Sequence, residues 1–194
     1  IPPPRGQVHH PDPDREGSVT FRETPIGGAW RITPDKMEDD RGFFARTWCQ
    51  REFTAHGLPG TFVQCSTSYN IRRGTLRGMH VQASPYEEGK LVRCTRGAAY
   101  DVIVDLRPSS ATFRRWHAVE LTADNHEMLY IPEGVAHGFQ TLVDETEIYY
   151  QMTAFHVPEA ARGVRWNDPA FGIVWPDDVT IISSRDRSYA DFVG

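Results

Sequence analysis

The chain has 194 residues, a length that fits a single domain, and 39% of them are hydrophobic, which is enough for a packed core. The formal net charge is −5, which argues against a protein that binds nucleic acid through its overall charge. No apolar run approaches the length of a membrane span and no signal-peptide core is found, so we expect a cytoplasmic protein without membrane contact.

The first 17 residues differ from the remainder of the chain. They contain five prolines and three acidic residues, and they show no hydrophobic periodicity. Such a segment lacks the apolar pattern of a packed element. We therefore expect residues 1–17 to form an extended or disordered arm and residues 18–194 to form one domain.

Short strands separated by turns are expected from Val19 onward. Strands are predicted over residues 90–95, 98–106, 116–121, 129–131 and 146–155, which are rich in apolar, β-branched and aromatic residues. The clearest helix signal covers residues 49–56, where Gly57 supplies a C-terminal cap. Strands at a spacing of roughly ten residues predict an all-β sandwich or barrel with a few short helices.

Two arginines flank a phenylalanine pair in residues 39–46. Arg41 and Arg46 carry guanidinium groups, which pair well with phosphate, and Phe43 and Phe44 offer faces on which a base stacks. The stretch is therefore a candidate nucleotide contact. An edge strand with core phenylalanines and solvated arginines is the more common outcome for this pattern.

Residues 72–80 combine arginines, two glycines and a histidine. Gly74 and Gly78 permit backbone angles or close approaches that other residues do not. Arg77 and His80 are three residues apart, which places them on opposite faces of a regular strand unless a glycine bulge redirects one of them. A lone histidine is more often structural, but these neighbours favour a functional His80.

Alternation along residues 89–97 places Lys90, Val92 and Cys94 on one face of a strand. On that face Lys90 would project into the interior of a barrel. A buried lysine is costly unless it pairs with a carboxylate or takes part in the chemistry. The alternative is an edge position at which Lys90 reaches water.

Residues 131–140 contain the spacing Pro-x-Gly-x-x-His, ending at His137, which matches the second half-motif of the cupin barrels. Metal-binding cupins have His-x-His and a glutamate in the first half-motif, and this chain has His80-Val81-Gln82 in place of His-x-His. The usual later asparagine is replaced by Thr141. Because two of four expected ligands are absent, we predict a cupin-like barrel without a bound metal.

The chain has three cysteines, Cys49, Cys65 and Cys94. Their odd number and wide spacing argue against a disulfide framework and against a zinc ribbon. We expect them to be buried, reduced thiols.

Taken together, these stretches resemble the dTDP-4-dehydrorhamnose 3,5-epimerase family over about residues 20–186. The stretches that carry the resemblance include Thr-Leu-Arg-Gly-Met-His, Lys-Leu-Val-Arg-Cys-Thr-Arg-Gly, Ile-Pro-Glu-Gly-Val-Ala-His-Gly-Phe and Trp-Asn-Asp-Pro. The resemblance implies a jelly-roll barrel that acts as a homodimer on a nucleoside-diphosphate sugar. It also implies that neither a metal nor an organic cofactor is needed.

The resemblance also assigns roles to residues of this chain. His80 matches the general base, Asp186 the carboxylate that orients it, and Tyr150 the proton donor. Tyr149 would face the other side of the strand. Lys90 and His137 match the lining of the sugar pocket, and Lys90 can stabilise an oxyanion. Further substrate-binding candidates are Arg41, Arg46, Gln64, Ser66, Arg77 and Arg185.

Four positions depart from the family pattern. Cys65 and Ser66 stand where many members have aspartate and asparagine, Arg46 stands where glutamate is frequent, and Phe155 stands where many have tyrosine. These departures leave open the nucleotide and whether C3, C5 or both are inverted. The alternatives are a C3-only or C5-only epimerase, a metal-dependent cupin and a non-catalytic sugar-binding barrel.

Overall fold

The computed structural model describes residues 17–193, and within them the all-β prediction is confirmed. Apart from Gly17, the predicted arm lies outside the described residues. No helix among residues 17–193 is both long and apolar enough to cross a membrane.

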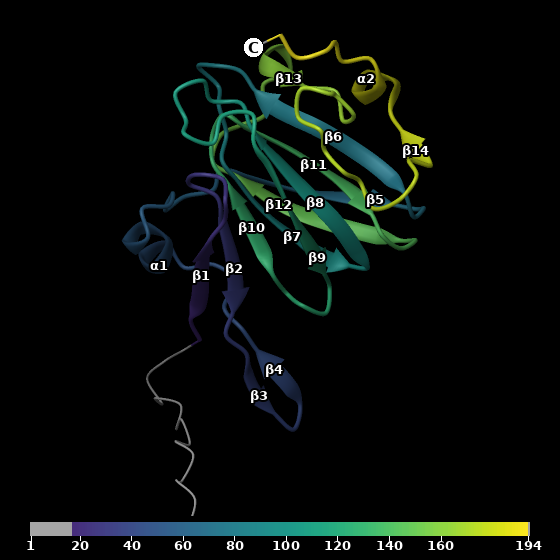
Figure 1. Cartoon of the computed structure of the whole chain (residues 1–194). Helices are drawn as coiled ribbons and strands as arrows, with labels where there is room; N and C mark the ends of the chain where they lie inside the picture. Colours follow the sequence, from purple (N-terminus) through teal and green to yellow (C-terminus); the bar gives the residue numbers. More distant parts are fainter. Residues whose placement is uncertain (1–16, 194) are drawn as a thin grey trace, which may run out of the picture.

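Two antiparallel sheets form the body of the protein (Figure 1). The first contains, in order, β1 (Val19–Glu23), β2 (Trp30–Pro34), β10 (Met128–Ile131), β7 (Lys90–Arg96), β12 (Thr146–Met152) and β5 (Gln64–Asn70). The second contains β13 (Ala161–Gly163), β6 (Thr75–Gln82), β11 (Val135–Thr141), β8 (Ala98–Asp105) and β9 (Trp116–Thr122). The short strand β14 (Ile181–Ile182) runs parallel to β6.

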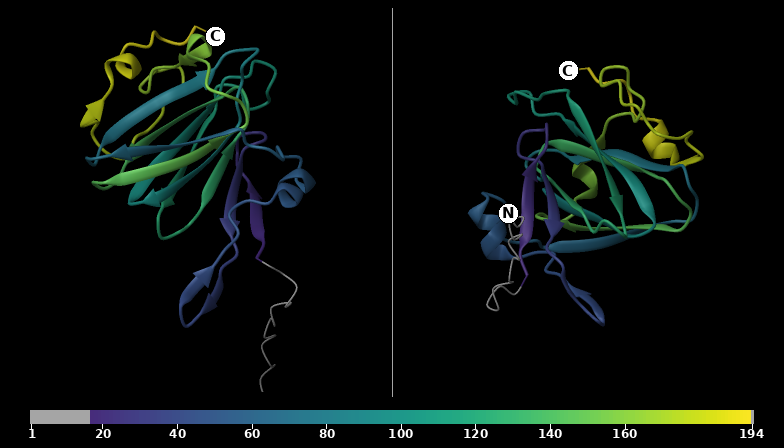
Figure 2. Two further views of the ribbon diagram at one scale, coloured as in Figure 1. Left: turned by 180° about the vertical axis from the view of Figure 1, so that it is seen from behind. Right: turned by 60° about the horizontal axis from the view of Figure 1, so that its bottom comes forward.

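The remaining elements lie at the periphery. The hairpin of β3 (Met37–Asp39) and β4 (Gly42–Phe44) extends away from the two sheets in both views of Figure 2. The helices are α1 (Gln50–Ala55) and α2 (Ser184–Arg187), with one 3₁₀ turn at Pro158–Ala160. The predicted helix over 49–56 is confirmed as α1, and Gly57 follows its last turn with a φ of 72°.

The core lies between the two sheets. Val92 and Ile148 point into it from the first sheet and Ile103 and Leu121 from the second, and all four are fully buried. Alternate residues of each strand supply these side chains, and each contributes about 1.5–3 kcal/mol by leaving water. The period-two pattern in the sequence is therefore the pattern that builds the core.

The predicted strand over 146–155 is too long, since β12 ends at Met152. Its two neighbours both begin at that level, where Met152 pairs with Gln64 of β5 and with Lys90 of β7. Past Met152 the Thr153 amide still donates to the carbonyl of Gly89, but no further pair of β12 with β5 or β7 follows, and the strand ends.

The prediction of three buried cysteines holds for Cys94 only, since Cys65 is exposed and Cys49 is partly exposed. Residues on β5 alternate, and Gln64 and Ser66 face the interior, so Cys65 faces outward. Cys94 is buried, and burial raises the pKa of its thiol to about 11. All three thiols are free.

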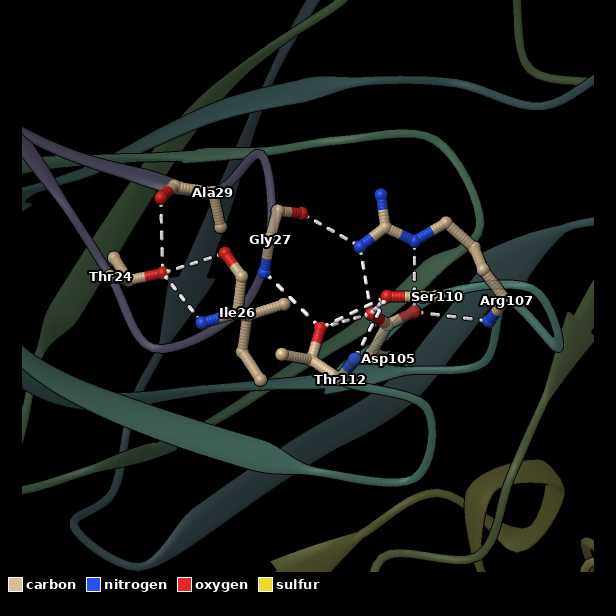
Figure 3. A network of polar contacts seen from close by, with 8 residues as sticks. All are labelled: Thr24, Ile26, Gly27, Ala29, Asp105, Arg107, Ser110 and Thr112. Atoms are coloured by element: carbon tan, nitrogen blue, oxygen red, sulfur yellow. Dashed lines mark hydrogen bonds and ion pairs between the residues drawn. The ribbon is translucent and has the colours of Figure 1, made fainter.

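A buried carboxylate ties the β1–β2 turn to the loop after β8 (Figure 3). Asp105 accepts hydrogen bonds from the Arg107 guanidinium, Ser110 Oγ and Thr112 Oγ1, and Arg107 also donates to the carbonyl of Gly27. Burial raises the pKa of Asp105, but these hydrogen bonds outweigh it and hold the pKa well below its ordinary value.

Replacing Asp105 by asparagine is expected to lower the free energy of unfolding by about 2–3 kcal/mol, because an amide nitrogen cannot accept the bonds that the carboxylate does. Urea denaturation at pH 7 measures the change, and Asp124→Asn in the exposed turn after β9 is the control, with about 0.5 kcal/mol or less. A carboxylate with a lowered folded-state pKa stabilises above its unfolded pKa of about 3.9 and loses that contribution as it protonates. The difference from wild type should therefore shrink below about pH 4; a constant difference would contradict this assignment.

Candidate active site

A pocket of about 370 Å³ lies between the first sheet, at β5, β12 and β7, and the second sheet, at β13, β6 and β11. Its lining combines cationic, titratable and neutral polar side chains with a few apolar ones. The polar and charged lining residues are Gln64, Ser66, Ser68, Arg77, His80, Gln82, Glu88, Lys90, His137, Tyr150, His156, Arg162 and Arg185.

Arg77 and His80 both line this pocket, although they are three positions apart on β6. On the neighbouring strand β11, the residues opposite them are Phe139 and His137, which are only two apart, so β6 carries one extra residue as a bulge. Gly78 lies in the bulge with a φ of 132°, and a Cβ there would lie 2.5 Å from the Cα of Gly138. The glycine thus permits both the bulge and the close strand approach, which is the exception that the sequence left open.

His80 is paired with Asp186. The Nε2 atom of His80 lies 2.7 Å from Oδ1 of Asp186, and the other carboxylate oxygen accepts the amide of Gly78 at 3.2 Å. The Asp186 side chain is 6% exposed, whereas that of His80 is 42% exposed and borders the pocket. A neutral imidazole that donates from Nε2 to this carboxylate keeps its lone pair on Nδ1.

Asp186 lies in α2, and the C-terminal segment carries it to β6 (Figure 1). Ser183 caps this helix by accepting the amide of Asp186 at 3.0 Å. Burial raises the pKa of Asp186, but the hydrogen bond and charge of His80 and the amide of Gly78 outweigh it and lower the pKa. The residue is therefore a carboxylate at neutral pH.

Two adjacent tyrosines of β12 face opposite sides of the first sheet. Tyr150 lines the pocket, whereas Tyr149 lies on the outer face against Arg93, with the guanidinium carbon 5.5 Å from the ring centroid. The two side chains therefore point in opposite directions, as expected for neighbouring residues of a strand, and Tyr150 is the one in the pocket. Burial raises the pKa of Tyr150, Arg77 opposes this and Glu88 adds to it, so the phenol is neutral at neutral pH.

Lys90 begins β7 and faces inward with Val92 and Cys94, as the alternation predicted. Its side chain is 12% exposed, and its Nζ lies 3.1 Å from Oε1 of Glu88. Glu88 is itself a pocket residue and its side chain is 8% exposed. The lysine therefore meets the cost of burial through an ion pair rather than through an edge position in water.

The Arg77 guanidinium is oriented by a hydrogen bond to Asn70. The Asn70 Oδ1 atom accepts from Nε of Arg77 at 2.7 Å, and its Nδ2 donates to the carbonyls of Ser68 and Thr146, each at 3.1 Å. Asn70 is 2% exposed. Because Nε is engaged by this bond, the two terminal nitrogens of the guanidinium remain for an anion.

His137 is part of a second histidine–carboxylate pair. Its Nε2 atom lies 2.9 Å from Oδ2 of Asp101 on the adjacent strand β8, and the two residues are 8% and 0% exposed. His137 pairs in register with His80 across β6 and β11, so both histidines face the same pocket.

The structure brings most of the predicted site together and leaves two arginines elsewhere. Gln64, Ser66 and Arg185 line the pocket. Arg41 lies on the β3–β4 hairpin with 89% of its side chain exposed and is bound to Asp39. Arg46 donates to the carbonyl of Gly17 at 2.9 Å. Neither Arg41 nor Arg46 is among the residues that line the pocket of its own chain.

Of the four departures from the family pattern, Ser66 lines the pocket and pairs in register with Tyr150. Cys65 is exposed, and 67% of Phe155 is exposed.

The sequence analysis did not predict seven polar residues of the site. Five of them line the pocket, namely Ser68, Gln82, Glu88, His156 and Arg162, and the other two, Asn70 and Asp101, bind Arg77 and His137. A period-two signal existed for Ser68, since it follows Gln64 and Ser66 on the same face of β5. Asp101 offered no such signal because its partner His137 is 36 residues away. Within residues 17–193 no three His, Cys, Asp or Glu side chains lie close enough to hold a metal ion.

The chain is similar to known proteins over most of its length. Residues 23–193 match the model of the dTDP-4-dehydrorhamnose 3,5-epimerase family. The dTDP-4-dehydrorhamnose 3,5-epimerase of Sinorhizobium fredii is 41% identical over 169 residues, which cover 87% of each chain.

Two solved structures show the same fold. The dTDP-4-dehydrorhamnose 3,5-epimerase of Bacillus anthracis, with TDP and PPi bound, has a TM-score of 0.87 and 39% identity over 90% of this chain and 100% of that chain. A double mutant of ChmJ, a 3′-monoepimerase from Streptomyces bikiniensis in complex with dTDP, has a TM-score of 0.81 and 31% identity over 87% and 85% of the two chains. These neighbours confirm the cupin-like jelly roll. Since sequence and structure match over most of the chain, the protein belongs to the dTDP-4-dehydrorhamnose 3,5-epimerase family of isomerases.

Proposed function

We propose that the protein inverts C3, C5 or both in a dTDP-4-keto-6-deoxyhexose, with His80 as the base and Tyr150 as the acid. The observation that carries the proposal is the pairing of His80 with buried Asp186 beside a pocket that Tyr150 and Lys90 also line. The family match supports sugar epimerisation as the reaction class.

The chemistry follows from the 4-keto group, which acidifies the hydrogens on C3 and C5. His80 removes one of them, and the ion pair with Asp186 stabilises the imidazolium that forms. The electrons move onto the ketone oxygen, and Lys90 stabilises the resulting oxyanion, which is worth about 2.7–4 kcal/mol for a well-placed donor. Both proton transfers use side chains alone, so we propose a reaction without a cofactor.

Tyr150 completes the inversion by returning a proton to the opposite face of the enolate. Its raised pKa keeps the phenol protonated at neutral pH, as an acid requires. The ChmJ double mutant supports this pairing. It replaces a histidine by asparagine and a tyrosine by phenylalanine 70 positions apart, the separation between His80 and Tyr150 in this chain.

The nucleotide end is assigned to Arg77, Arg185, Gln64 and Ser66. Asn70 holds Arg77 with its terminal nitrogens unused, which suits a diphosphate. The Bacillus anthracis relative was solved with TDP and PPi bound, which supports a thymidine nucleotide as the carrier.

The test is proton NMR of dTDP-4-keto-6-deoxyglucose incubated with the enzyme in D₂O. Deuterium at both carbons would assign a 3,5-epimerase, and deuterium at one carbon would assign a C3-only or C5-only enzyme. The C3-only alternative is kept because ChmJ, a 3′-monoepimerase, has the same fold. No incorporation at either carbon would rule out the proposed function.

A homodimer would reconcile the position of Arg41 with a role in substrate binding. The β3–β4 hairpin extends away from its own barrel and exposes Met37, Phe43 and Phe44, so it can reach a second subunit (Figure 2). The mass in solution, measured by light scattering, should then be twice the chain mass of 22.0 kDa. Arg41→Ala should weaken TDP binding about tenfold or more, whereas Arg51→Ala on α1 should not. A monomer with unchanged TDP affinity in Arg41→Ala would contradict both parts.

A further inference from the structure

We infer that Glu88 is a positioning residue that fixes the ammonium of Lys90 at the sugar end of the pocket. The inference rests on the proposed function and adds to it a residue that the role assignments of the resemblance do not include. Glu88 acts through Lys90.

The ion pair is nearly enclosed. The Lys90 Nζ and Glu88 Oε1 atoms are 3.1 Å apart, and the side chains are 12% and 8% exposed. Water and salt screen such a pair less than a surface pair. The pair therefore favours a position of the flexible Lys90 side chain in which its ammonium stays beside Glu88.

The backbone between the two residues is also fixed. Gly89 donates its amide to Oγ1 of Thr153 at 2.8 Å and accepts the amide of Thr153 at 3.0 Å. A Cβ at Gly89 would lie 2.8 Å from the hydroxyl of Tyr130, so no larger residue fits without a shift. Glu88 and Lys90 therefore flank a glycine whose backbone is held by two hydrogen bonds. Their pairing starts from a fixed stretch of backbone.

The charges of the pocket lining indicate that Glu88 and Lys90 lie near the sugar and not near the diphosphate. The pocket lining holds the cations Arg77, Lys90, Arg162 and Arg185, the titratable groups His80, His137, His156 and Tyr150, and one carboxylate, Glu88. Asp101 and Asp186 approach through their histidines. A diphosphate repels a carboxylate and is attracted by the arginines, so Glu88 and Lys90 fit the uncharged sugar.

The pair has two consequences for the reaction. Without Glu88, the Lys90 ammonium is free to turn toward the phosphates, where it strengthens nucleotide binding without stabilising an enolate. Glu88 and Tyr150 also line the same pocket. Burial is the main cause of the raised pKa of the Tyr150 phenol. Arg77 lowers this pKa, and the Glu88 carboxylate raises it further. A neutral residue 88 should therefore lower the pKa of the proton donor.

The test compares Glu88→Gln with Glu87→Gln, the same change one residue earlier at a position that does not line the pocket. Crystal structures of both variants give the position of Lys90 Nζ. Kinetics in the D₂O assay give kcat against pH, and calorimetry gives the TDP dissociation constant. In Glu88→Gln we expect the Lys90 Nζ to leave its position and kcat to fall about 10- to 100-fold. TDP affinity should be kept or increased. The alkaline limb of the profile of kcat against pH should move to lower pH. Glu87→Gln should match wild type in all four.

The outcomes separate this inference from the proposed function. If Nζ stays in place in Glu88→Gln, the positioning role is wrong whatever the activity. If Nζ moves but kcat and its pH limb stay at the Glu87→Gln values, the fixed ammonium has no part in the reaction and the inference is wrong. Parallel loss of TDP affinity and kcat would indicate a general structural role and would also overturn it. Absence of deuterium incorporation by the wild-type protein would overturn the proposed function, and the crystallographic comparison would still decide whether Glu88 fixes Lys90.

Discussion

Replacing His80 by asparagine is expected to lower kcat by about 10²–10⁴-fold and to abolish deuterium incorporation at both C3 and C5. Asparagine keeps a hydrogen-bonding group near Asp186 but has no lone pair basic enough to remove a carbon-bound proton. TDP affinity should be unchanged, because the diphosphate is assigned to Arg77 and Arg185. The D₂O assay and calorimetry measure the two quantities on the same protein.

His117→Asn on β9 is the matched control, since it makes the same chemical change in the second sheet outside the pocket. It should retain wild-type exchange. If His80→Asn still incorporates deuterium at the wild-type rate, the base is another residue, and the pairing with Asp186 serves only to hold the C-terminal segment against β6.

Replacing Tyr150 by phenylalanine is expected to lower inversion about 10²-fold or more while proton removal continues. The enolate still forms at His80, but the opposite face lacks a donor, so the proton returns from the side that lost it. NMR should therefore show deuterium entering the sugar with the starting configuration retained. This separation of exchange from inversion distinguishes an acid from a residue that merely shapes the pocket.

Tyr149→Phe is a close control for this variant. It removes the same hydroxyl from the next residue of β12, but on the outer face of the sheet against Arg93. Inversion should be unaffected there. Equal losses in the two variants would show that the hydroxyls stabilise the strand rather than donate the proton, and loss of exchange together with inversion in Tyr150→Phe would place Tyr150 on the proton-removing side.

These two predictions depend on different levels of structure. The opposite orientations of Tyr149 and Tyr150 follow from the period of two along any strand, as does the inward direction of Lys90, Val92 and Cys94. The pairing of His80 with Asp186 joins residues 106 positions apart, and it exists because the C-terminal segment packs along β6.

The sequence by itself determined the all-β class, the main strands after residue 89, helix α1 and the inward face of β7, because strand alternation and glycine caps act over a few residues. It also carried enough ordered motifs to identify the family. It misplaced the end of β12 and the environment of Cys65, because both depend on which strands lie alongside.

The tertiary structure alone decided how the site is assembled. A one-residue bulge at Gly78, permitted by the close approach of Gly138, brings Arg77 and His80 to one pocket. The strand next to that of His137 supplied Asp101, and the end of β5, in the other sheet, supplied Asn70 to Arg77. Arg41 remained on a distant hairpin. Register, bulges and packing between residues far apart in the chain result from contacts across the whole fold, so no local pattern in the sequence could specify them.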